Sequence, residues 1–222
     1  MADGTLYIGT RRYSSWSLRG WLAVKLAGLA ALEVTIPLGG DGETAEVKRI
    51  SPNGLVPYLE HRGARVWETI AICEYCAEIE PALWPADRTA RAEARSIAAE
   101  MHSGFAALRQ AMPMNLGADK PGVGRSEAVL ADVARIEAIW ARTREALGAG
   151  GPFLFGAAFT AADAMYAPVV ARFLSYQPPL SEASRTYCTA VRAHPLLVEW
   201  YAAAAMEPAE WRLAKYEAVG AD

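Results

Sequence analysis

Residues 6–19 read Leu6-Tyr7-Ile8-Gly9-Thr10-Arg11-Arg12-Tyr13-Ser14-Ser15-Trp16-Ser17-Leu18-Arg19. The short apolar run at the start, followed by a polar cluster, indicates a strand that leads into a turn. From Trp16 to Leu29 the apolar residues recur at helical spacing. Ser14 or Ser15 is placed to cap this helix, and Gly28 is placed to end it. The stretch therefore predicts a strand, a turn and a helix, in that order.

The following segments extend this order. Residues 33–38 alternate in strand fashion, and residues 43–50 predict one or two helical turns. Residues 55–60 and 64–67 are short strand candidates joined by a hairpin loop of about three to four residues. Residues 68–79 have helical spacing. We therefore predict an α/β domain over residues 1–81, with the order βαβ-α-ββα and a hairpin at one edge.

The remainder of the chain has a different character. Residues 82–88 make a plausible linker, and the segments after them are rich in alanine with helical periodicity. An all-helical domain is expected over residues 89–222. Its predicted helices are 89–112, 126–147, 161–176, 184–193 and 196–206.

Composition limits the classes of function. The 222 residues are 53% hydrophobic and 21% charged, which is typical of a folded chain. The net charge of −3 gives no basic surface for a nucleic acid. No secretory signal and no apolar stretch of about 20 residues is visible, so we expect a cytoplasmic protein without a membrane span. Three cysteines are too few for a disulfide framework, which agrees with a reducing compartment.

Three short motifs could carry chemistry. Ser14-Ser15-Trp16-Ser17 lies where the strand passes into the helix, so backbone N–H groups and the positive end of the helix dipole favour an anion or thiolate there. The alternative is that a serine only caps the helix. Val56-Pro57 begins a strand, where proline is tolerated at an edge or beside a ligand. Glu68-Thr69 begins a helix and either binds a ligand or supplies a cap and a charge that complements the dipole.

A fourth motif, Cys73-Glu74-Tyr75-Cys76, invites interpretation as a dithiol site. A reactive thiol pair needs a helix N-terminus to lower its pKa, and these cysteines lie within a later helix. We therefore interpret them as buried apolar residues. His61, His102 and His194 are scattered without ligand spacing, so no metal site is expected.

In combination the motifs resemble those of the soluble glutathione transferases over essentially the whole chain. Residues 14–19 resemble the Ser-Ser-Cys-Ser-Trp-Arg stretch of the zeta-class enzymes, the maleylacetoacetate isomerases. Residues 51–59 are similar to the family's Asn-Pro-x-Gly-Lys-Val-Pro-x-Leu, and residues 67–72 to its Glu/Gln-Ser-x-Ala-Ile. Residues 159–163 resemble the family's capping box and staple. Residues 100–115 resemble a group of bacterial transferase-like proteins.

The resemblance implies a thioredoxin-like N-terminal domain, glutathione as co-substrate, a small hydrophobic electrophile and a homodimer. Ser14 falls on the family's catalytic serine, so we expect it to stabilise the glutathione thiolate. In the family the residue before the proline pairs through its backbone with the cysteinyl part of glutathione, and the proline is cis, so the same is expected of Val56 and Pro57. In the family the corresponding acidic residue and hydroxyl hold the γ-glutamyl group, so Glu68 and Thr69 are expected to do so here. The expected glutathione-binding residues are Ser15, Trp16, Leu55, Val56, Pro57, Glu68 and Thr69.

Two positions depart from the family pattern. The zeta-class cysteine is Trp16 here, which argues against an isomerase mechanism that needs that thiol. The common lysine before Val-Pro is Leu55, so the glycine carboxylate of glutathione needs another partner, for which Lys48 or Arg49 is a candidate.

An electrophile site is expected between the domains, on a helix over residues 97–112. The mixture of apolar and cationic side chains there suits an electrophile with an aromatic body and an acidic group. The alternative is that the apolar members are interhelical core. Two other functions stay open, a glutathione-dependent cis–trans isomerase and a non-catalytic ligand carrier of the same fold. The candidate residues are Met101, Phe105, Ala106, Arg109, Met112 and Tyr166, with Arg172 as a weaker one.

Overall fold

The computed structural model describes residues 2–40 and 44–220, so Glu43, the predicted start of the second helix, lies outside the described residues. A four-stranded sheet has the order β2-β1-β3-β4. Strands β1 and β2 are parallel, whereas β3 runs antiparallel to both β1 and β4. The strands are β1 (Gly4–Gly9), β2 (Ala31–Ile36), β3 (Tyr58–His61) and β4 (Ala64–Trp67).

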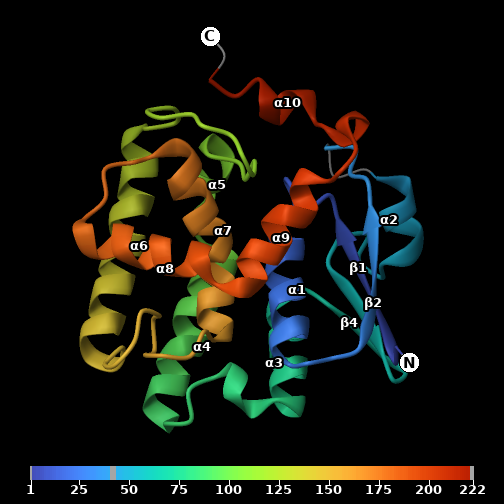
Figure 1. The fold of residues 1–222 in the computed structure, drawn as a ribbon, viewed down its shortest axis with the longest axis horizontal. Coiled ribbons are helices and arrows are strands. Elements are labelled where there is room, and N and C mark those ends of the chain that lie inside the picture. The colour runs from blue at the N-terminus through green and yellow to red at the C-terminus, as the bar shows by residue number, and fades with distance from the viewer. Residues whose placement is uncertain (1, 41–43, 221–222) are drawn as a thin grey trace.

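Helices lie on both sides of this sheet (Figure 1). Helices α1 and α3 cover the face toward the rest of the chain, and α2 lies on the opposite side. The thioredoxin-like order of the first part is therefore confirmed, and an all-helical part follows it. The helices are α1 (Ser15–Leu26), α2 (Ala45–Ile50), α3 (Thr69–Ile79), η1 (Pro81–Leu83), α4 (Arg88–Ser103), α5 (Ala106–Ala111), α6 (Glu127–Leu147), α7 (Ala161–Tyr176), α8 (Glu182–Ala193), α9 (Pro195–Ala205), η2 (Ala209–Trp211) and α10 (Ala214–Glu217).

The start of α1 is fixed by local polar contacts. Leu6 and Ile8 of β1 are fully buried beneath the helices. At the other end of the turn the Ser14 side chain accepts from the backbone N of Ser17, so the predicted serine cap is confirmed and is Ser14. Gly28 follows the helix with a positive φ of 65°, as its predicted role in ending the helix requires.

Two predicted details are wrong. The hairpin loop has two residues, because His61 still pairs in β3 and only Arg62 and Gly63 connect the strands. Both have positive φ, of 49° and 85°, which matches the right-handed twist of a two-residue hairpin. The single helix expected over residues 89–112 is also two helices, α4 and α5. The break lies at Gly104 and Phe105, where Phe105 has a φ of 58°.

Helix α7 is the centre of the helical part and packs against both α1 and α4. Every residue of α7 except Leu174 is buried. Its N-terminus carries the predicted capping box, in which Thr160 and Asp163 satisfy each other's free polar groups. Because α7 contacts α1 directly, it places side chains of the helical part beside the serine-bearing end of α1.

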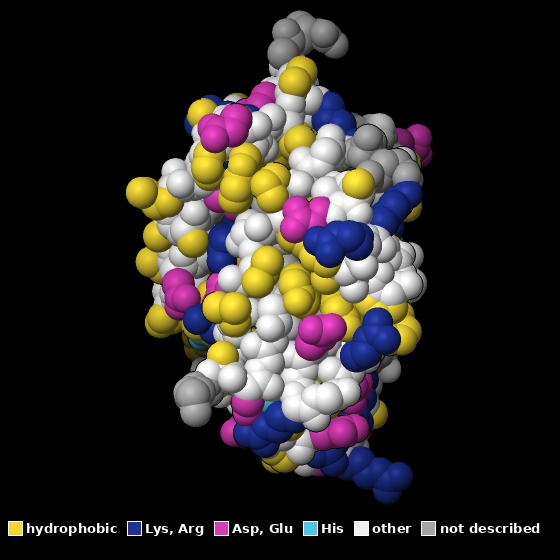
Figure 2. Space-filling model, turned by 90° about the vertical axis from the view of Figure 1, so that its right-hand side faces the viewer, with side chains coloured by type: hydrophobic (Ala, Val, Ile, Leu, Met, Phe, Trp, Pro, Cys, Tyr) yellow, Lys and Arg dark blue, Asp and Glu magenta, His cyan; other side chains and the backbone are white. Residues whose placement is uncertain are grey.

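The surface carries side chains of both charges, in agreement with the small net charge of −3 (Figure 2). Figure 2 shows Lys and Arg side chains interspersed with Asp and Glu on the face that includes α2 and the sheet. Within residues 2–40 and 44–220, no helix has the length and apolarity needed to cross a bilayer.

Gly20 couples α1 to the loop before β3. A Cβ at this position would lie 2.6 Å from Cγ of Pro57. We expect Gly20→Ala to destabilise the fold by about 1–3 kcal/mol through overpacking, although alanine favours a helix over glycine by about 1 kcal/mol. Urea unfolding measures the change, and an unchanged or raised midpoint would show that the loop yields without cost.

Candidate active site

A cavity of about 570 Å³ lies where the N-terminus of α1 meets the helical part of the chain. Its walls come from the turn before α1, from α2 with the loop before β3, and from α5, α7 and the C-terminal residues. Chain segments that are far apart in sequence thus meet around one space. The predicted site residues in its lining are Ser14, Ser15, Trp16, Leu55, Val56, Arg109 and Arg172.

Ser14 is the polar group at the positive end of α1. Its Oγ accepts from the backbone N of Ser17 at 3.4 Å and shares a 2.7 Å hydrogen bond with Ser17 Oγ. Ser17 Oγ also accepts from the backbone N of Gly9 at 2.9 Å. Because a hydroxyl hydrogen rotates, Ser17 can donate to Ser14 and leave the Ser14 hydrogen for a ligand. The geometry therefore lets Ser14 donate to an anion beside the helix N-terminus.

Ser15 and Trp16 face basic side chains. Ser15 Oγ accepts from Arg172 Nη2 at 3.4 Å. The Cζ atoms of Arg19 and Arg109 lie 4.6 Å and 5.5 Å from the centre of the Trp16 ring. The Trp16 ring is thus held by two cation–π contacts.

The loop before β3 forms the opposite wall. Asn53 Oδ1 accepts from Ser51 Oγ at 2.9 Å and from the backbone N of Leu55 at 3.1 Å, which fixes the turn. The Val56-Pro57 peptide bond is cis, as predicted. Leu55 and Val56 line the cavity, whereas Pro57 is buried behind them against Gly20.

Glu68 and Thr69 begin α3 just outside the cavity lining. Glu68 occupies the N-cap position of α3 with a φ of 68°, but its side chain makes no cap hydrogen bond. The predicted side-chain cap is therefore wrong, and a role of its charge toward the helix dipole stays a prediction. Its Oε1 accepts from Asn53 Nδ2 at 3.1 Å, and its Oε2 lies 3.6 Å from His102 Nε2. Thr69 Oγ1 donates to the backbone O of Trp16 at 3.5 Å. Thr69 is therefore joined to Trp16 of the cavity lining, and Glu68 is joined to Asn53, which lies in the loop that carries Leu55 and Val56.

Most apolar candidates for the electrophile site lie elsewhere. Tyr166 is fully buried, and its hydroxyl donates to the backbone O of Ile97 at 3.1 Å. Because Phe105 adopts a left-handed conformation, its side chain turns into the core and the expected continuous helix face does not exist. Arg109 and Arg172 are the two predicted members that reach the cavity. The residues Met101, Phe105, Met112 and Tyr166 are buried outside the lining, as the interhelical alternative describes.

The C-terminal residues supply a wall that the sequence did not reveal. Leu213 and Tyr216 line the cavity, and so does Tyr13. The Tyr13 hydroxyl donates to the Glu217 carboxylate and accepts from the backbone N of Leu213 at 3.2 Å. Burial and the bond to Glu217 raise the pKa of Tyr13 to about 12. Tyr13 is therefore a neutral anchor for the C-terminal residues at physiological pH.

Neither predicted partner of the glycine carboxylate lies in the cavity lining. Lys48 and Arg49 are on α2, whose Val47 lines the cavity instead. The assignment of either residue to glutathione stays a prediction.

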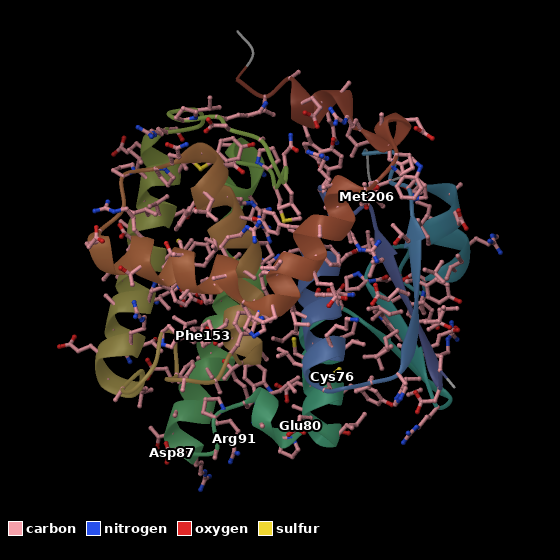
Figure 3. All side chains as sticks on the ribbon, in the orientation of Figure 1. Cys76, Glu80, Asp87, Arg91, Phe153 and Met206 are labelled. Atoms are coloured by element: carbon pink, nitrogen blue, oxygen red, sulfur yellow. The ribbon has the colours of Figure 1, made fainter. Side chains whose placement is uncertain are left out.

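The cysteines take no part in the cavity. Figure 3 shows Cys76 on α3, and both Cys73 and Cys76 are fully buried. Burial raises the pKa of Cys76 to about 12 and that of Cys73 further above its usual value. The interpretation of both cysteines as buried apolar residues is therefore confirmed. Within the described part of the chain, no three His, Cys, Asp or Glu side chains are grouped to hold a metal.

Several solved structures have the same fold as this chain. A glutathione transferase homologue from a Burkholderia strain, BGR1, with bound glutathione, is 24% identical, with a TM-score of 0.70 over 92% of this chain and 100% of that one. The maleylacetoacetate isomerase of Anaeromyxobacter dehalogenans, with bound dicarboxyethyl glutathione and citrate, is 24% identical, with a TM-score of 0.64 over 94% and 99%. A diazinon-metabolizing glutathione S-transferase of the silkworm is 16% identical, with a TM-score of 0.71 over 92% and 97%.

Family models agree with these likenesses, whereas no curated protein matches the chain. The model of the glutathione S-transferase N-terminal domain matches residues 13–79, and that of the C-terminal domain matches residues 87–203. These ranges hold the serine turn, the cis-proline loop and helices α1, α2, α5 and α7, whereas Leu213 and Tyr216 of the cavity wall lie beyond them. The chain belongs to the glutathione S-transferase family.

Proposed function

We propose that this protein is a glutathione transferase that activates glutathione as its thiolate for attack on a small hydrophobic electrophile. The observation that carries the proposal is Ser14, a hydroxyl at the N-terminus of α1 in the wall of a cavity. In the reaction the sulfur lone pair forms a C–S bond to the electrophilic carbon. The leaving group departs with its electron pair, or the proton given up by the thiol is returned to the adduct.

The interactions at Ser14 can supply the free energy needed to lower the pKa of a bound thiol. To lower a thiol pKa by about 2 units requires about 2.7 kcal/mol of differential stabilisation. A hydrogen bond to a charged group supplies about 1.5–3 kcal/mol. A helix N-terminus adds about 0.3–1 kcal/mol. Ser14 together with α1 therefore accounts for activation without a second thiol or a metal.

Glutathione is expected to lie along the wall nearest the sheet. The Val56 backbone would pair with its cysteinyl part, with Ser15, Trp16, Leu55 and Pro57 around it. Glu68 and Thr69 would hold the γ-glutamyl group, because its amino cation matches the exposed Glu68 carboxylate. The glutathione bound in the Burkholderia structure supports this use of the fold. Association into a homodimer stays a prediction from the family.

Binding of the γ-glutamyl group gives a direct test. Glu68→Ala is expected to weaken glutathione binding about tenfold, because a charge-assisted contact is lost. Calorimetry with glutathione and with cysteinylglycine, which lacks that group, measures the change. Cysteinylglycine should bind the variant and the unaltered protein equally.

The matched control is Glu78→Ala, which removes the same charge from an exposed position on α3. It should leave both affinities unchanged. Equal weakening of glutathione binding by the two variants would show that the effect comes from the change in net charge. Equal binding of glutathione by all three proteins would remove Glu68 from the site.

A further inference from the structure

Three guanidinium groups from different helices lie beside the serine turn. Arg19 is on α1, Arg109 on α5 and Arg172 on α7. Arg109 and Arg172 line the cavity, and Arg19 lies behind Trp16, whose ring contacts both Arg19 and Arg109. Arg19 is 0% exposed and Arg172 is 4% exposed. Positive charge is thus concentrated on the helical wall of the cavity.

None of the three has an acidic partner among the residues that the structure describes. Arg172 donates to the backbone O of Met112 at 2.8 Å, to that of Pro168 at 3.0 Å and to Ser15 Oγ. Because a guanidinium has five N–H groups, Arg172 keeps donors that these bonds do not use.

The other two have unused donors as well. Arg109 donates to the backbone O of His102 at 3.3 Å. Arg19 donates to the backbone O of Met165 at 2.7 Å and to that of Ser15 at 3.3 Å, and its buried Nη2 has no hydrogen-bond partner. All these acceptors are neutral.

Such an arrangement is costly without a ligand. A buried charge normally has a counter-ion, and a buried donor normally has an acceptor. Burial and the charge of Arg109 lower the pKa of Arg172 to about 10, and burial with both neighbouring arginines lowers the pKa of Arg19 well below its usual value. A planar carboxylate would satisfy the free donors and relieve the repulsion.

We propose that Arg109 and Arg172 bind a carboxylate of the second substrate, so that the electrophile is an acid with an apolar body. This inference rests on the proposed function. The carboxylate would lie on the helical wall, opposite the loop of Val56. Pro113, Met114 and Leu213 in the same wall would contact the apolar body.

The carboxylates of glutathione are less suitable occupants. Glu68 and Thr69, expected to hold the γ-glutamyl end, lie outside the cavity lining, and the expected glycine end lies toward α2. The arginines come from α5 and α7 and meet the serine turn from the other side. A carboxylate bound to these arginines would therefore lie on the far side of the glutathione sulfur from the rest of the tripeptide. A second substrate must enter on that side.

The test compares cinnamate with cinnamamide, which have the same apolar body and differ in charge. Calorimetry is carried out with the full chain saturated with S-methylglutathione, which fills the thiol site and cannot react. Cinnamate is expected to bind at least about tenfold more tightly than cinnamamide. In Arg109→Gln and Arg172→Gln this preference should fall to within about twofold, while the affinity for S-methylglutathione stays unchanged.

Arg142→Gln is the matched control, because it removes the same charge from a side chain that is 77% exposed on α6. It should keep the preference for cinnamate. Arg109→Gln keeps the test valid if loss of the buried Arg172 disturbs folding. Equal binding of acid and amide, or a preference that survives in both cavity variants, would overturn the proposal.

Displacement of cinnamate by S-methylglutathione would also overturn it, because the arginines would then serve glutathione itself. The binding of S-methylglutathione alone tests the proposed function separately. If cinnamate bound with the expected preference but S-methylglutathione did not bind, the anion site would stand and the transferase proposal would fail.

Discussion

Replacement of Ser14 by alanine is expected to lower kcat/KM for glutathione transfer by about 10- to 100-fold near neutral pH. The hydroxyl contributes one hydrogen bond to the thiolate, worth about 1.5–3 kcal/mol. Its loss raises the pKa of the bound thiol by about 1–2 units, because 1.36 kcal/mol corresponds to one unit. The rate therefore falls below that pKa and recovers as the pH rises. A pH profile of kcat/KM measures both the loss and the shift.

Two neighbouring serines provide the comparison. Ser17→Ala removes the hydroxyl that shares a hydrogen bond with Ser14, and Ser15→Ala removes the one that accepts from Arg172. Both should lower the rate less than Ser14→Ala does. Loss of the Ser14 cap costs about 1 kcal/mol of stability, which leaves the fold intact. A large loss in Ser15→Ala with little change in Ser14→Ala would move the thiol contact to Ser15.

The second large effect is expected at Asp163, a fully buried carboxylate at the start of α7. It accepts from Thr160 N and Oγ1 at 2.9 Å and from Leu154 N and the Tyr187 hydroxyl at 3.0 Å. Asp163→Ala leaves these donors without acceptors, each worth about 1–3 kcal/mol when buried. We expect a loss of about 3–5 kcal/mol, measured by urea unfolding, and a fall in Tm of about 10 °C.

Tyr187→Phe gives the contribution of a single hydrogen bond to Asp163 for comparison. It removes one of the donors and leaves the carboxylate with the others, so a loss of about 1 kcal/mol is expected. A loss below about 1 kcal/mol in Asp163→Ala would show that water or a rearranged loop replaces the carboxylate.

The order of elements could be predicted because buried faces leave periodic patterns in the sequence. Leu6 and Ile8 alternate into the core, and α7 coincides with its predicted bounds. The break between α4 and α5 was missed because alanine-rich residues continue across it. Gly104 was the available signal, since a Cβ there would lie 2.7 Å from the backbone O of Glu100.

The candidate site was predictable where it depends on local sequence. Ser14 and the loop of Val56 could be located because a cap and a proline have local signatures. The opposite wall depends on tertiary contacts instead. Leu213 and Tyr216 belong to residues held by the Tyr13 hydroxyl and by the Lys120 ammonium group. Short elements of that kind have no periodicity that a sequence pattern could detect.

Ultraviolet absorbance of the thiolate, followed while the pH of the protein–glutathione complex is titrated, tests the central claim most directly. We predict that the pKa of the bound thiol lies about 2 units below that of free glutathione. Binding of glutathione with an unshifted thiol pKa would contradict thiol activation and favour a carrier of the same fold.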